Sequence, residues 1–113
     1  MSEAAQRGRF TRLALSFDGV ASAPHMDRTA FRARRIFATL AADGASANLK
    51  LTPEDQAMKT MLAPEAFTPV AGGWGAMGWT TARLSALSDA ELLDALRLAH
   101  AFGSAPPRRA RKR

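Results

Sequence analysis

The sequence predicts an α+β domain in which one antiparallel sheet packs against an N-terminal and a C-terminal helix as a two-layer sandwich. The first observation is the order of the predicted segments, which is helix, three strands, helix, two strands, helix. The second is that short turns join successive strands, and such turns favour antiparallel pairing. The third is a length of 113 residues, 47% of them hydrophobic, which is enough for one domain with its own core.

The first predicted helix spans residues 3–16. Four apolar side chains recur there at the spacing of one helical face, and the arginines of this segment occupy the other faces. The four are Phe10, Leu13, Ala14 and Phe17. A loop is predicted to follow, because Asp18-Gly19 and Ala23-Pro24 both favour turns.

Two strands are predicted over residues 30–33 and 36–40, with a tight connection at Arg34-Arg35. The segment is rich in β-branched and aromatic residues, which favour strands. Phe31 alternates with Arg32, as expected for a strand with one buried and one solvated face.

Asp43-Gly44 predicts a hairpin turn that leads into a third strand over residues 47–51. The run Thr52-Pro53-Glu54-Asp55 then predicts the start of a second helix, with an N-cap hydroxyl, a proline at the first position and acids near the positive end of the dipole. This helix is expected to end near Leu62. Its inward residues are predicted to be Ala57, Met58, Met61 and Leu62.

The last third of the chain predicts two strands and a helix. Residues 67–70 contain Pro69, so this segment is expected at a sheet edge, and residues 79–84 are expected to form the last strand. Ser88 and Glu91 form a capping box that opens the final helix, and Gly103 is expected at its C-cap. Its core-facing residues are predicted to be Leu92, Ala95, Leu96 and Ala99.

The net charge of +6 is concentrated at the C-terminus, where five of the sixteen basic residues occupy the last six positions. These are Arg108, Arg109, Arg111, Lys112 and Arg113. Because two prolines precede these mutually repelling cations, the sequence predicts a domain over residues 1–105 and a disordered basic tail over residues 106–113. Such a tail binds nucleic acid by counterion release; the alternative is a tail that only favours solubility.

The remaining charge is also uneven, with +4 in residues 1–50 and −3 in residues 51–105. Arg32, Arg34, Arg35 and Lys50, which we call the basic patch, would project from neighbouring strands and could contact phosphates. Arg83 is a further candidate for this group. The alternative interpretation is an ordinary solvated sheet face.

Residues 73–78 match the pattern G-x-G-x-x-G. The dinucleotide-binding version of this pattern follows a buried strand and opens a helix, whereas here a proline-containing segment precedes it and a strand follows. We therefore interpret the match as a coincidence, in a loop that needs positive φ angles. Trp74 either folds back onto the sheet or forms an exposed platform for stacking bases, and Trp79 is expected in the core.

Enzymatic activity is not favoured. No serine lies in a nucleophile elbow, no carboxylates are paired on a strand, and no cysteine is present. His25 and Asp27 are only half of a metal site, so no metal or cofactor is expected. No segment reaches about 18 apolar residues and no signal peptide is evident, so a cytoplasmic protein without membrane association is expected.

Four sequence blocks resemble the MmcQ/YjbR family, and together they cover most of residues 10–102 in the family's order. They are Phe31–Leu40, Ala47–Gln56, Phe67–Pro69, and Trp74-Gly75 with Gly78–Thr81. The family often has a glycine where this chain has Arg34-Arg35, so a tighter or shifted turn is expected there. The basic tail lies outside the resemblance.

The resemblance implies a YjbR/CyaY-like fold with a double-wing arrangement of β-hairpins, and DNA binding. Together with the residues, it leads us to expect a small, monomeric, non-enzymatic DNA-binding protein. The wings would be the hairpin at residues 34–35 and the hairpin that contains residues 72–78. The related frataxins bind iron through an acidic ridge, but the first helix here has only Glu3, so iron binding is not supported. Two alternatives remain open: a protein-interaction module that uses the sheet face or the glycine-rich loop, and a sensor with a small-molecule pocket near Phe67, Trp74 and Trp79.

Overall fold

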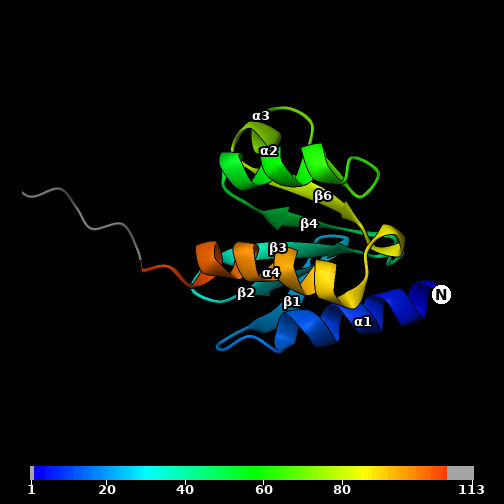
Figure 1. The fold of residues 1–113 in the computed structure, drawn as a ribbon. Coiled ribbons are helices and arrows are strands. Elements are labelled where there is room, and N and C mark those ends of the chain that lie inside the picture. The colour runs from blue at the N-terminus through cyan, green and yellow to red at the C-terminus, as the bar shows by residue number, and fades with distance from the viewer. Residues whose placement is uncertain (1, 107–113) are drawn as a thin grey trace, which may run out of the picture.

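Six strands form one antiparallel sheet in the computed structural model, which describes residues 2–106 (Figure 1). The elements in chain order are α1 (Glu3–Leu15), β1 (Ala21–His25), β2 (Arg28–Arg32), β3 (Ile36–Ala41), β4 (Ser46–Lys50), α2 (Pro53–Leu62), β5 (Phe67–Pro69), α3 (Gly73–Ala76), β6 (Trp79–Arg83), a 3-10 turn (Leu84–Ala86) and α4 (Asp89–Ser104). The strand order across the sheet is β1-β2-β3-β4-β6-β5. The predicted α+β class, with terminal helices packed on an antiparallel sheet, is confirmed.

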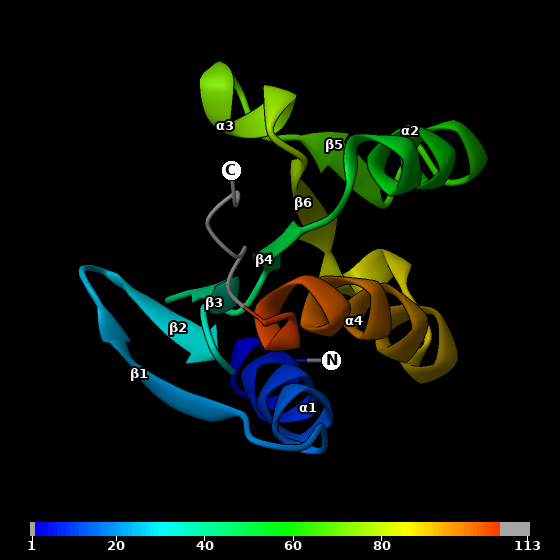
Figure 2. The same cartoon turned by 90° about the vertical axis from the view of Figure 1, so that its left-hand side faces the viewer.

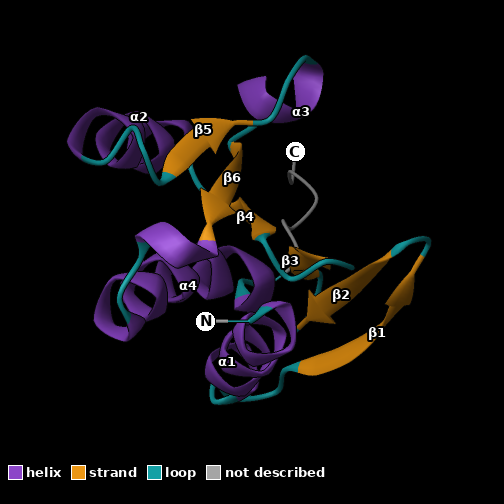
Figure 3. Ribbon diagram, turned by 90° about the vertical axis from the view of Figure 1, so that its right-hand side faces the viewer, coloured by secondary structure: helices purple, strands orange, loops and turns teal. Residues whose placement is uncertain are grey.

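The sheet is strongly curved, and the helices α1, α2 and α4 lie on its convex side. Figures 2 and 3 view the strands from opposite ends of the molecule and show them as an arc. The β1–β2 hairpin stands at one end of the arc and α3 at the other. The concave side of the sheet therefore faces away from the three long helices. Both predicted wings exist, as the hairpins β2–β3 and β5–β6.

The core lies between the sheet and the helices α1 and α4. The largest fully buried side chains include Phe10, Phe31, Phe37, Leu49, Leu92 and Leu96. The prediction for α4 is confirmed, because Leu92, Ala95, Leu96 and Ala99 are all fully buried. Its capping box is also confirmed: the Ser88 hydroxyl accepts from the Glu91 backbone N–H at 3.1 Å, and the Glu91 carboxylate accepts from the Ser88 N–H at 2.8 Å.

Helix α2 begins as predicted, with Thr52 Oγ1 accepting from the Asp55 N–H at 3.0 Å. The prediction for its inward face is wrong, because no residue of α2 is buried. Met58, Met61 and Leu62 are 40%, 73% and 70% exposed. The reason is the position of α2 at the β5 end of the sheet, where it extends beyond the α1–α4 layer (Figure 1).

Strand β1 was expected to be a loop, and it forms an edge strand instead. All five of its residues are exposed, so no apolar alternation marks it in the sequence. A two-residue turn, Met26-Asp27, joins β1 to β2, and His25 and Arg28 form the strand pair that flanks this turn. Met26 adopts a φ of 59°, which is rare for a residue with a side chain.

Gly103 does not cap α4, because the helix continues through Ser104. A Cβ at Gly103 would lie 2.6 Å from a ring carbon of Phe37. The glycine is therefore required by close packing of α4 on β3. Its carbonyl accepts hydrogen bonds from the backbone N–H groups of Arg34 and Arg35, at 2.8 and 3.1 Å, so the β2–β3 turn is held against the end of α4.

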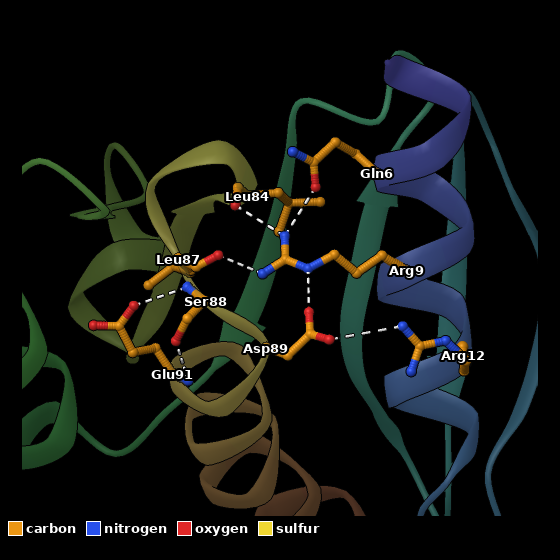
Figure 4. Close-up of polar contacts among 8 residues, drawn as sticks. All are labelled: Gln6, Arg9, Arg12, Leu84, Leu87, Ser88, Asp89 and Glu91. Carbon is orange, nitrogen blue, oxygen red and sulfur yellow. Dashed lines mark hydrogen bonds and ion pairs between the residues drawn. The ribbon is translucent and has the colours of Figure 1, made fainter. Parts of the chain in front are cut away.

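A buried arginine joins α1 to the start of α4 (Figure 4). The guanidinium of Arg9 donates to the Asp89 carboxylate at 2.5 Å, to Gln6 Oε1 at 2.9 Å and to the Leu84 carbonyl at 3.1 Å, and also to the Leu87 carbonyl. Arg9 is 8% exposed. The sequence predicts Arg9 away from the apolar face of α1, and the structure shows that this position is nevertheless buried.

This contact predicts an acid-sensitive fold. The hydrogen bond from Arg9, and the charges of Arg9 and Arg12, hold the pKa of Asp89 below its usual value. A carboxyl group whose pKa is depressed in the folded state stabilises the fold fully above its unfolded pKa of about 3.9, and this contribution is lost as the pH falls through the folded value.

We therefore expect the thermal midpoint to fall as the pH is lowered from neutral through about 4 towards 2. In Asp89→Asn the fall should be shallower. Some of it should remain, because the pKa of Glu91 is also lowered, chiefly by the Ser88 backbone N–H. A pH profile for Asp89→Asn that runs parallel to the parent would contradict this assignment.

Candidate nucleic-acid interface

The concave face of the sheet carries a polar and aromatic surface. The pairing register of the strands determines which residues contribute to it. Directly paired residues of antiparallel strands project to the same side. Ala38, Leu49 and their partners face the core, so the alternate positions must project to the concave side. The concave-face pairs are Arg32 with Ile36, Thr39 with Asn48, Asn48 with Thr81, and Lys50 with Trp79.

This face contains a hollow of about 510 Å³ that runs between the two ends of the arc. The end of β1 and the β1–β2 turn supply one wall, Arg28 of β2 and the strands β3 and β4 supply the floor, and the segment from β5 to the start of β6 supplies the other wall. Its lining residues are His25, Met26, Asp27, Arg28, Ile36, Thr39, Asn48, Val70, Trp74 and Trp79. We call this feature the hollow.

Two tryptophans form the aromatic wall of the hollow. Trp74 lies on α3 and is 62% exposed, and Trp79 begins β6 and is half-buried. Their ring centroids are 6.5 Å apart with an interplanar angle of 74°, an edge-to-face contact. The prediction that Trp79 belongs to the core is wrong: pairing with Lys50 places it on the concave face, and its neighbour Thr80 is the buried residue.

The floor of the hollow is rich in hydrogen-bond donors. Arg28 donates through Nε to Thr39 Oγ1 at 2.9 Å and through Nη2 to the Thr39 carbonyl at 3.2 Å. Thr81 donates to Asn48 Oδ1 at 2.8 Å. Within residues 2–106, these contacts leave Arg28 Nη1 and Asn48 Nδ2 without a hydrogen-bond acceptor, so both groups can donate to a bound molecule.

The structure brings together only two members of the basic patch. Arg35 and Lys50 contact the ring of Phe102 near the end of α4, at 4.6 and 4.4 Å from the ring centroid. Such cation–π contacts hold two like charges close together. Burial lowers the pKa of Lys50, and the positive charge of Arg35 lowers it further.

The chain matches the family model described as YjbR over residues 15–102, which is most of its length. The chain belongs to the YjbR family. The predicted membership is therefore confirmed, although no curated protein matches the sequence.

A solved structure supports the same fold for this YjbR chain. The crystal structure of Deinococcus radiodurans protein DR2400, described as having a DUF419 domain, is similar with a TM-score of 0.67 at 17% sequence identity. The match covers 80% of this chain and 72% of that chain. At this identity the likeness concerns the fold.

The other predicted site residues of the YjbR domain lie apart from one another. Arg32 and Arg34 are exposed at and just after the end of β2, where Arg32 Nη1 donates to the Arg34 carbonyl at 3.4 Å. Arg83 was expected to join the basic patch, but it pairs with Ser46 at the opposite end of β4 from Lys50. Four residue steps of about 3.3 Å rise separate the two ends. The tail residues Arg108, Arg109, Arg111, Lys112 and Arg113 lie outside the described residues.

Sequence reasoning missed Arg28 and Asn48 as site residues. The sequence predicts a loop before residue 30, because no apolar alternation marks β1. Arg28, Ala30 and Arg32 nevertheless lie at alternate positions along β2 and share its concave side. Asn48 alternates with the buried Ala47 and Leu49, and a polar residue between apolar ones was the available signal.

The described part of the YjbR domain holds no group of three or more His, Cys, Asp or Glu side chains arranged for a metal ion. Within the same residues, no helix is long and apolar enough to cross a membrane. The match to G-x-G-x-x-G has a local structural explanation. A Cβ at Gly75 would lie 1.7 Å from the Val70 carbonyl oxygen, and one at Gly78 would lie 1.9 Å from that of Leu51.

Proposed function

We propose that this YjbR protein binds DNA, with phosphate contacts from cations on and beside the concave face of the sheet. The proposal takes the protein to be a non-enzymatic, cytoplasmic monomer. It assigns phosphate contacts to Arg32, Arg34, Arg35 and Lys50, and a separate contact to Arg83 at the other end of β4. The C-terminal arginines and Lys112 would add affinity that does not depend on sequence.

The observation that carries the proposal is the segregation of ion pairs. All four ion pairs among residues 2–106 lie on the helical side of the domain. They join Arg9 and Arg12 to Asp89, and Lys59 and Arg97 to Asp94. The cations of the basic patch therefore have no carboxylate partner in the described structure, and a polyanion can neutralise them without displacing one.

A matched pair of double variants tests this assignment. Arg32→Ala with Arg34→Ala removes two cations beside the concave face, whereas Arg12→Ala with Arg97→Ala removes two cations from the helical side that are 65% and 61% exposed. Each phosphate contact contributes about 0.9 to the slope of log affinity against log salt. We expect the first variant to lower this slope by about 2 and the second to leave it nearly unchanged.

The measurement is a salt titration of DNA binding by fluorescence anisotropy, with the full chain and both variants. If the slope of log affinity against log salt falls equally in the two variants, only the net charge matters. If the slope falls in neither variant, the basic patch is not part of the interface. A variant with the five tail cations replaced by serine separates the contribution of the tail from that of the domain.

A protein-interaction module is a second candidate, favoured by the exposure of Met61 and Leu62 on α2. Exposed apolar patches of this kind mark partner surfaces. A stoichiometric partner that resists nuclease treatment and is lost in a Met61→Gln, Leu62→Gln variant would support this function in place of DNA binding.

A further inference from the structure

The proposed phosphate contacts do not account for the hollow, because most of its lining surface is apolar and cannot bind a phosphate. Ile36, Val70, Trp74 and Trp79 all line it, and none of them offers a charge to a phosphate. Trp74 keeps 62% of its surface exposed. A large ring held open to solvent beside a second ring is a surface for stacking a planar ligand.

The floor supplies polar groups of one kind. Arg28 Nη1 and Asn48 Nδ2 are both donors without an acceptor in the described residues. A planar molecule that stacks against the tryptophans would present its edge to these donors. Nucleobases combine a π face with ring-nitrogen and carbonyl acceptors on their edges, and arginine and asparagine are side chains that commonly contact these edges.

The charges around the hollow suit a base that is attached to a phosphate backbone. Lys50 is paired in register with Trp79, and Arg32 is paired with Ile36, so residues with cationic side chains pair with lining residues on two strands. The Lys50 ammonium lies over the Phe102 ring and donates to the Leu51 carbonyl at 3.2 Å. Asp27 is the one carboxylate of the lining. It is exposed, in the turn of the β1–β2 hairpin, on the other side of the floor from the tryptophans.

We infer that the hollow seats one unstacked base of single-stranded DNA. The base stacks on the exposed ring of Trp74 beside Trp79, and its edge accepts hydrogen bonds from Arg28 and Asn48. The flanking phosphates contact Lys50 and Arg32. A duplex cannot use this site, because its bases are stacked on one another and show only their edges in the grooves. The inference rests on the proposed DNA binding and makes it selective for single strands.

The protein reports on this site directly, because Trp74 and Trp79 are its only two tryptophans. We expect oligothymidylate to quench the intrinsic fluorescence of the full chain, and a duplex of the same length to quench it far less. Trp74→Ala should weaken binding to oligothymidylate by about tenfold or more, and should change duplex affinity by less than about twofold.

Two further variants control for effects other than stacking. Trp74→Phe keeps a stacking ring and should retain affinity within about threefold of the parent. Met77→Ala shortens an apolar side chain that follows α3, is 54% exposed and does not line the hollow. It should leave binding unchanged. Circular dichroism of Trp74→Ala checks that truncation of this exposed ring leaves the fold intact.

The outcomes separate this inference from the proposed function. If the parent binds duplex and single strand equally, or if Trp74→Ala binds oligothymidylate as well as the parent does, the base site is wrong. The proposed function then still stands if the salt slope responds to the Arg32 and Arg34 substitutions. If neither form of DNA binds in a salt-dependent way, the proposed function itself fails.

Discussion

Arg9→Ala is expected to lower the free energy of unfolding by about 3 kcal/mol or more, because it removes a buried group that satisfies several acceptors at once. The guanidinium donates to Gln6 and to the carbonyls of Leu84 and Leu87, which have lost water as partners. Truncation would leave these acceptors unpaired and would open a gap between α1 and the segment that leads into α4.

Urea denaturation of the parent and of three variants measures this effect. Arg9→Lys keeps the charge but not the planar guanidinium group with its several donors, so we expect it to recover only part of the lost free energy of unfolding. Arg12→Ala is the matched control, because Arg12 lies 3.8 Å from the same carboxylate and is 65% exposed. It should change stability by less than about 1 kcal/mol. A small and equal effect in Arg9→Ala and Arg12→Ala would show that burial of Arg9 contributes nothing.

Gly75→Ala is the second substitution for which we expect a large effect, of roughly 3 kcal/mol or more, or a displaced α3. The added methyl group would lie 1.7 Å from the carbonyl oxygen of Val70 and 2.9 Å from its carbonyl carbon. Backbone atoms cannot give way as the end of a side chain can. Since Trp74 immediately precedes Gly75 in α3, a displaced α3 would also move the aromatic wall of the hollow.

Gly73→Ala provides the control on the other side of Trp74. A Cβ at Gly73 meets no atom within 4 Å, so we expect a stability change below about 1 kcal/mol. Urea denaturation gives the stability of both variants, and near-ultraviolet circular dichroism reports the tryptophan environment. If Gly75→Ala matches Gly73→Ala in both measurements, the close approach to Val70 does not constrain the loop.

The parts of the fold that the sequence predicted well are those with local chemical signals. The start of α2 follows from Thr52 and Pro53, and the start of α4 follows from the capping box of Ser88 and Glu91. Strand β5 lies at the edge, as Pro69 predicted. In each case the signal and the structure it predicts lie within a few residues of each other.

The errors concern contacts between residues far apart in the chain. Arg9 is buried because its partners Leu84, Leu87 and Asp89 come from the other end of the sequence, and helical periodicity cannot show this. Gly103 is required by Phe37, on a strand some 66 positions earlier. Such pairs are set by the packing of α4 on the sheet, which only the folded structure defines.

The candidate site was predicted in the same partial way. The sequence supplied the cations and Trp74, because charge and aromatic character are visible in one residue. It did not supply Arg28 or Asn48, because their role depends on which face of the sheet they share. It also grouped Arg83 with Lys50, and only the β4–β6 register separates them.

The two edges of the sheet have a consequence for how this protein can associate. Pro24 lies in β1 and Pro69 in β5, the first and last strands of the sheet. Each proline removes a backbone donor that an incoming strand would need. Growth of the sheet by strand addition, whether by a peptide or by another copy, is therefore disfavoured at both edges. Aggregation by edge pairing is limited for the same reason, and the concave face remains the accessible side of the sheet.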